Sequence, residues 1–142
     1  MDHRYFEWII IDDGSTDNTK EKIDNFIENS PYKIKYYYQE NQGKHICYNK
    51  AIDIAEGELF LILDSDDEIV NNCLETFWNY WENLSQTTKD ELFSINCLCK
   101  DGYTNKRIGF ELEEGLFQDA FKWRYANKIT FDTWGAVSTK TF

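Results

Sequence analysis

The amino-acid sequence predicts an α/β domain in which helices cover both faces of a mainly parallel sheet. Apolar, β-rich runs alternate with segments of helical periodicity across residues 6–84. This alternation of strand and helix is typical of right-handed parallel crossovers. The chain has 142 residues, of which 42% are hydrophobic. This length and composition suit one domain with a core.

The first strand is predicted at residues 6–12, FEWIIID, because parallel strands buried on both faces read as continuous apolar runs. It ends in the sequence DDGSTDNT, which leads into a predicted helix at residues 17–29. In that helix, Ile23, Phe26 and Ile27 fall at helical spacing. These two elements form the first half of a crossover.

The second strand is predicted at residues 32–39, YKIKYYYQ, and the loop ENQGKH follows it. A second helix is expected at residues 45–57, since Gly57 lies where helices usually end. The third strand is predicted at residues 58–64, ELFLILD. Strand, helix and strand thus repeat a second time.

A third helix is predicted at residues 70–84 from apolar residues that recur with the period of an amphipathic helix. These residues are Val70, Cys73, Leu74, Phe77, Trp78, Trp81 and Leu84. Beyond this helix, we expect a strand at residues 91–99, a helix at 116–126, and strands at 129–131 and 134–138.

The formal net charge is −11, from 15 basic and 26 acidic side chains. Such a surface repels phosphate backbones, which argues against nucleic acid as a partner and favours divalent cations. The longest apolar run is too short to span a bilayer, so no transmembrane segment is expected. The four cysteines fit no zinc-site spacing and are interpreted as reduced thiols of a cytoplasmic protein.

Two acidic turns follow predicted strands: the first acidic turn is Asp12 and Asp13, and the second is residues 64–67, DSDD. The carboxyl ends of parallel strands meet at one edge of a sheet, where ligands bind. Clustered carboxylates repel one another unless a cation relieves them. Magnesium or manganese, completed by substrate phosphates, would do so. On spacing alone, ligand binding has an alternative at each turn. Residues 64–67 could form a solvated turn, and the segment DDGSTDNT could cap the following helix.

The sequences FEWIIIDDGSTDNT and YYYQENQGKHICYNKAIDIAEGELFLILDSDDEI occur in this order and together resemble the family 2 glycosyltransferases, over about residues 5 to 80. The resemblance implies the GT-A fold, a Rossmann-like three-layer α/β/α sandwich. It also implies metal-assisted transfer of a sugar, with inversion, from a nucleotide-diphosphate sugar in polysaccharide or glycan biosynthesis. A UDP-sugar is the first choice of donor. The implied cofactor is Mn²⁺ or Mg²⁺, and the implied acceptor is a glycan or a lipid-linked glycan.

By position, Asp13 matches the aspartate that contacts the nucleobase in this family, and Asp12 is its neighbour. Lys44 falls in the loop where family members often present a basic residue to the donor. Asn49 falls in the following helix, where an asparagine is common. The resemblance therefore implies that all four residues belong to the substrate-binding site.

The second acidic turn matches the D-x-D motif of the family through Asp64 and Asp66. The resemblance implies that Asp64 contacts the ribose and that Asp66 binds the metal, directly or through phosphate. Asp67 is adjacent and is expected to support or replace Asp66 at the metal.

Two departures from the family pattern stand out. Nothing here resembles the opening VSVIIPxYN strand, and only seven residues precede WIII. We expect a single truncated GT-A domain over residues 1–142, with nucleotide-sugar binding at about 5–80 and the start of the acceptor side at about 90–142. The catalytic base is expected outside this chain. Acidic candidates inside it are Glu113, Glu114 and Asp119, and no spacing favours them.

Two alternatives remain open from the sequence. One is a non-catalytic fragment or interaction domain that retains only nucleotide and metal binding. The other is a nucleotidyltransferase-like relative, which would normally carry a glycine-rich phosphate loop that is absent near the start of this chain. The expected location is the cytoplasm, and peripheral association with the inner face of the membrane is an alternative.

Overall fold

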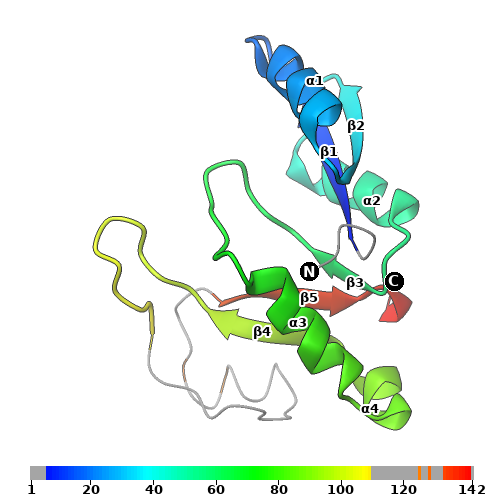
Figure 1. Cartoon of the computed structure of the whole chain (residues 1–142), viewed down its shortest axis with the longest axis vertical. Coiled ribbons are helices and arrows are strands. Elements are labelled where there is room, and N and C mark those ends of the chain that lie inside the picture. Colours follow the sequence, from blue (N-terminus) through cyan, green and yellow to red (C-terminus); the bar gives the residue numbers. More distant parts are fainter. Residues whose placement is uncertain (1–5, 110–124, 126–127, 129–132, 142) are drawn as a thin grey trace.

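The computed structural model describes residues 6–109, 125, 128 and 133–141, and Figure 1 shows their arrangement. The elements in chain order are β1 (Glu7–Asp13), α1 (Thr19–Asn29), β2 (Lys33–Gln39), α2 (Lys44–Ile54), β3 (Leu59–Leu61), α3 (Cys73–Glu82), α4 (Gln86–Glu91), β4 (Ser94–Leu98), β5 (Thr133–Ser138) and the 3₁₀ helix η2 (Thr139–Thr141). The described strands form two sheets, of two and three strands.

The first sheet pairs β1 and β2 in parallel over their whole length. Trp8 of β1 meets Phe26 of α1 edge to face, with ring centroids 6.2 Å apart. On β2, Lys35 donates a hydrogen bond to the carbonyl of Ile54, at the end of α2. The partner of Trp8 in the ladder is the residue before Lys35, so the two contacts lie on opposite faces. Helices therefore cover both faces of this sheet. The predicted crossover of β1, α1 and β2 is confirmed, whereas β3 does not pair with these strands.

The second sheet has the order β3-β5-β4, and both of its pairings are antiparallel. The strand predicted at 134–138 is confirmed as β5, which lies between the other two. Among the described strands, parallel pairing is therefore confined to β1 and β2, although a mainly parallel sheet was expected. Periodicity locates a strand but does not reveal which neighbour pairs with it, so this difference was invisible in the sequence.

The strand β3 is shorter than the predicted 58–64. Its ladder with β5 ends at Leu61, and the indole of Trp134 donates a hydrogen bond to the carbonyl of Ile62. Beyond this point the chain leaves the sheet and forms the loop to α3 seen in Figure 1. The apolar run thus supplies one short strand and the approach to the second acidic turn.

The helices also differ from expectation, and α2 ends at Ile54, before the predicted end at Gly57. The helix predicted at 70–84 begins at Cys73, because Val70 is 64% exposed and lies in the preceding turn. The short helix α4 was not predicted, and it replaces the start of the strand expected at 91–99. Ser85 caps it by accepting a hydrogen bond from the N–H of Thr88 at 3.1 Å.

The core beneath β3 is built on α3. Phe77 and Trp81 are buried, and the ring of Phe77 meets Trp134 edge to face at 5.6 Å. The indole of Trp81 donates a hydrogen bond of 2.9 Å to Glu58, just before β3. The core therefore fixes both ends of the short strand that leads to the second acidic turn.

Some predictions fall outside the described residues. These are the helix at 116–126, apart from Tyr125, and the strand at 129–131. No helix in the described part of the chain has the length and apolar character needed to cross a bilayer.

Candidate functional site

Asp12 in the first acidic turn is a buried carboxylate that accepts hydrogen bonds from Ser15 and Tyr36. It is 6% exposed. Its Oδ1 accepts from the N–H of Ser15 at 2.8 Å, and its Oδ2 accepts from the hydroxyl of Tyr36 at 2.6 Å. Burial acts to raise the pKa of Asp12, but these hydrogen bonds outweigh burial and lower the pKa. Burial and the bond to Asp12 raise the pKa of Tyr36 to about 12.

Asp13 holds the loop that precedes α2. Its Oδ1 accepts from the N–H of Gln42 at 2.9 Å and from the side-chain amide of Gln39 at 2.8 Å. Its Oδ2 accepts from the N–H of Gly43 at 2.8 Å. The bond from Gln42 and then the bond from Gln39 lower the pKa of Asp13. The ionised carboxylate thus fixes the backbone just before Lys44.

Gly14 allows the first acidic turn to approach this loop closely. Its φ is +90°, a conformation that L side chains rarely adopt. A Cβ at this position would lie 2.9 Å from the backbone nitrogen of Asn41. The glycine in DDGS is therefore required by the packing of the turn against the loop before α2.

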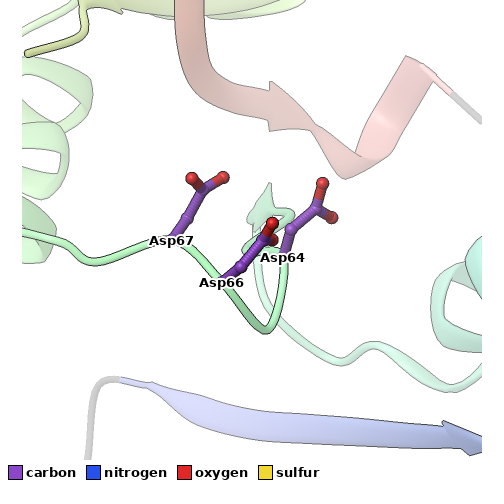
Figure 2. A group of neighbouring side chains, drawn as sticks. All are labelled: Asp64, Asp66 and Asp67. Atoms are coloured by element: carbon purple, nitrogen blue, oxygen red, sulfur yellow. The ribbon is translucent and has the colours of Figure 1, made fainter. Parts of the chain in front are cut away.

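The second acidic turn presents three carboxylates on one side of its loop, as Figure 2 shows. A hydrogen bond of 3.1 Å from the N–H of Asp67 to the carbonyl of Asp64 closes the turn. One oxygen each from Asp64, Asp66 and Asp67 lie within 4.8 Å of one another. Asp66 and Asp67 are exposed, and no donor in the described part of the chain reaches their carboxylates. These oxygens remain available to a ligand.

The loop before α2 brings the two acidic turns together. Asp13 holds the N–H groups of Gln42 and Gly43, and the ammonium of Lys44 forms an ion pair with Asp64. A single short segment therefore contacts both turns. The turns follow strands of different sheets, so the single sheet edge expected from the sequence is not formed by the described strands. Asn49 is exposed on α2, and its side chain makes no hydrogen bond within the described ranges.

The donor set of the second turn fits a hard divalent cation. All three clustered side chains are carboxylates, and oxygen ligands are those that Mg²⁺ and Mn²⁺ prefer. None of the four cysteines belongs to this cluster. Asp66 and Asp67, with Asp64 beside them, are the residues that could hold such a metal.

Sequence patterns did not reveal two residues that support the site, Tyr36 and Gln39. Both lie on β2, and in the parallel register Gln39 is directly opposite Asp13. Pairing the two strands in register from their carboxyl ends would have found this contact. The acidic candidates for a catalytic base, Glu113, Glu114 and Asp119, lie outside the described residues.

Comparisons with known proteins agree with these motifs. The sequence model of the family described as "Glycosyl transferase family 2" matches residues 2–137. The GalNAc(5)-diNAcBac-PP-undecaprenol beta-1,3-glucosyltransferase of Campylobacter jejuni is 36% identical over 125 residues, which are 84% of this chain and 37% of that protein. The putative teichuronic acid biosynthesis glycosyltransferase TuaG of Bacillus subtilis is 36% identical over 120 residues, 84% of this chain and 47% of TuaG.

Glycosyltransferase GlyG of Streptococcus pneumoniae is 38% identical over 77 residues, which cover 54% of this chain and 25% of GlyG. The chain thus spans less than half the length of each of these three relatives. No solved structure gives a significant match. The family match nevertheless covers nearly all of the sequence, including both acidic turns. With its α/β architecture of the GT-A type, the chain belongs to glycosyl transferase family 2.

Proposed function

We propose that this chain forms the donor-binding part of an inverting glycosyltransferase, which moves a sugar from a nucleoside diphosphate to an acceptor hydroxyl in glycan assembly. Family membership supports sugar transfer as the reaction class. The observation that carries the proposal is the cluster of open carboxylates after β3, with a lysine beside it. Oxygen ligands and one basic group together suit a metal-bound diphosphate.

In this proposal, the second acidic turn and Lys44 bind the charged part of the donor. Asp66 and Asp67 hold Mn²⁺ or Mg²⁺, and Asp64 contacts the ribose. When bound, the metal neutralises the negative charge that develops on the leaving diphosphate. Lys44, with 58% of its side chain exposed, contributes a positive charge at the same place.

The first acidic turn binds the base of the nucleotide, with uracil as the proposed base. An ionised carboxylate offers about four acceptor positions. The amide of Gln39, the N–H groups of Gln42 and Gly43 and the thiol of Cys47 donate to the carboxylate of Asp13, and a base N–H would take the place of the weakly donating thiol. Asp12 is buried, so its contribution is to hold the turn in shape. Asn49 is exposed on α2 and is proposed to face the donor.

The acceptor is proposed to be a glycan or a lipid-linked glycan. The Campylobacter jejuni relative is named for an undecaprenol-linked acceptor, and TuaG is named for teichuronic acid biosynthesis. Transfer of sugar to a lipid-linked acceptor would place the protein in the cytoplasm, at the inner face of the membrane. Inversion also needs a base that takes the proton of the acceptor hydroxyl. None of the described residues is proposed as this catalytic base.

Titration calorimetry with UDP, with and without Mn²⁺, tests the proposal. We expect UDP to bind in the presence of Mn²⁺ and to bind at least about tenfold more weakly after Asp66→Ala. Asp53→Ala is the matched control, because Asp53 is an exposed aspartate on α2 with the same charge and no place in the site. Equal UDP affinity in Asp66→Ala and in the unchanged protein would refute the assigned metal site.

A comparison of UDP with CDP tests how the base is read, because uracil carries an N–H at N3 where cytosine carries an acceptor. We expect UDP to bind more tightly than CDP, and Asp13→Asn to reduce this difference in affinity, because an amide can present a donor where the base N–H needs an acceptor. If both nucleotides bind equally before and after this substitution, Asp13 does not read the base.

A further inference from the structure

Lys44 lies at the first position of α2, where its ammonium forms an ion pair with Oδ2 of Asp64. Its side chain is 58% exposed, and that of Asp64 is 39% exposed. The ammonium also lies 5.5 Å from the ring centroid of Tyr48, one turn further along the helix. A lysine ammonium is charged at neutral pH, and its ion pair with Asp64 favours the charged form.

The backbone of the loop before α2 is held in place, and it positions Lys44 beside the second acidic turn. The N–H groups of Gln42 and Gly43 are held by Asp13, and the N–H of Ile46 donates to the carbonyl of Gly43 at 3.0 Å. Gly43 has a φ of +93°, which directs the chain from the loop into the helix. The placement of Lys44 beside Asp64 therefore follows from the packing of the first acidic turn.

The ion pair is made with Asp64, whose carboxylate lies beside those of the proposed metal ligands Asp66 and Asp67. Asp64, Asp66 and Asp67 gather negative charge within 4.8 Å, and Lys44 is the lysine that contacts this cluster within the described ranges. A divalent cation among these oxygens would be attracted by the carboxylates and repelled by the ammonium at the same site. The two positive groups therefore compete.

We propose that Lys44 is a built-in counter-ion of the second acidic turn, which opposes metal binding in the absence of nucleotide and moves from Asp64 to the diphosphate when the donor binds. This inference rests on the proposed function, because it takes the cluster to be the metal site. The flexible four-carbon stem of lysine permits the move, and the ring of Tyr48 keeps the ammonium nearby.

The exchange couples the two ligands. Since the diphosphate draws the ammonium away from Asp64, nucleotide binding raises the affinity for the metal. By thermodynamic linkage, the metal raises the affinity for the nucleotide by the same factor. A lysine that only contacted the donor would help the nucleotide but would leave the affinity for free metal unchanged. The two roles therefore give different results in a metal titration.

The test is a titration of Mn²⁺ alone, followed by electron paramagnetic resonance of free Mn²⁺ and by calorimetry, with Lys44→Met. Methionine keeps much of the length of the side chain and removes the charge. We expect Mn²⁺ to bind about threefold to fivefold more tightly in the variant, the range expected for loss of an exposed ion pair. With Mn²⁺ saturating, UDP should bind about tenfold more weakly.

Lys140→Met is the matched control. Lys140 pairs with Asp90 of α4 at similar exposure, 58% and 55%, so its substitution makes the same change in net charge outside the site. It should leave both affinities within about twofold of the unchanged protein. Circular dichroism checks that each variant is folded, and Lys44→Gln serves as a second neutral variant.

Three other outcomes overturn the proposal, and they are distinguishable. Unchanged or weaker binding of Mn²⁺ in Lys44→Met, with weaker binding of UDP, would show that Lys44 serves the donor only. An equal gain in Lys140→Met would assign the effect to net charge. If neither the unchanged protein nor Lys44→Met binds Mn²⁺, the proposed function fails as well, and the counter-ion role fails with it.

Discussion

The two acidic turns have similar sequences but different surroundings. Hydrogen bonds from backbone and side-chain donors reach the carboxylates of both Asp12 and Asp13. In the second turn, Lys44 forms an ion pair with Asp64, and no other side chain in the described ranges donates to the three carboxylates. The first turn lies between β2 and the loop before α2, whereas the second lies on the loop between β3 and α3 that extends beyond its sheet (Figure 1).

This difference separates carboxylates that stabilise the fold from carboxylates that are open to a ligand. A buried carboxylate with its donors in place stabilises the folded chain, and loss of its charge leaves those donors unpaired. Exposed, clustered carboxylates repel one another and gain from an added cation. Substitutions in the first turn should therefore reduce stability, and those in the second should reduce binding.

The largest effect is expected from Gly14→Ala in the first turn. The new Cβ would lie 2.9 Å from the backbone nitrogen of Asn41, at a φ of +90°. We expect a loss of about 3 kcal/mol in the free energy of unfolding, from backbone strain and steric contact. Urea denaturation measures it. Gly102→Ala is the control, because nothing lies within 4 Å of its added Cβ. Equal losses in both variants would contradict the packing described for the first turn.

Asp12→Ala should cost about 2 kcal/mol in the free energy of unfolding, because it leaves the partly buried hydroxyl of Tyr36 and the N–H of Ser15 without their acceptor. Tyr36→Phe should cost about 1 kcal/mol, since it removes one of these bonds. The double variant should then lose less than the sum of the two single losses. Additive losses in urea denaturation would show that Asp12 and Tyr36 do not interact.

The first turn should also make stability depend on acid pH. The folded-state pKa of Asp12 is lowered below its unfolded value of about 3.9. The stabilisation is therefore complete above about pH 5 and is lost as the pH falls through the folded pKa. Urea midpoints measured from pH 7 to pH 3 should fall less for Asp12→Asn than for the unchanged protein. Parallel curves would exclude Asp12 as a source of the acid dependence.

The smallest effect on stability is expected in the second turn. Asp67→Asn removes one exposed charge from a cluster of like charges and breaks no side-chain hydrogen bond within the described residues. The melting temperature should stay within about 1 °C or rise slightly. Binding of Mn²⁺ should nevertheless weaken by about tenfold. A melting temperature several degrees lower would show that Asp67 supports the fold.

Much of the first sheet was predictable because local patterns define it. The apolar run of β1, the spacing of Ile23, Phe26 and Ile27 in α1, and the tyrosine-rich β2 each place an element from neighbouring residues. The helix α4 was missed because its residues, QTTKDE, have no apolar period, although Ser85 before them is a typical cap. The antiparallel sheet was missed because β5 pairs with β3 across more than 70 residues of chain.

The candidate site divides in the same way. Asp64, Asp66 and Asp67 are neighbours in sequence, so their clustering was expected, and the structure places their carboxylates together. The pair of Lys44 with Asp64 spans 20 residues, and that of Tyr36 with Asp12 spans 24. No periodicity relates residues at these separations. The support of the first turn and the counter-ion of the second were therefore not predicted as contacts.

The sequence by itself determined the family, the strand and helix units of the first sheet, and the positions of both acidic turns, because each depends on residues close together in the chain. Only the tertiary structure decided that Asp12 and Asp13 are held by donors of the protein while Asp66 and Asp67 remain open. The physical reason is that a hydrogen bond needs its donor within about 3 Å. Strand register and loop packing, which depend on distant residues, set that distance.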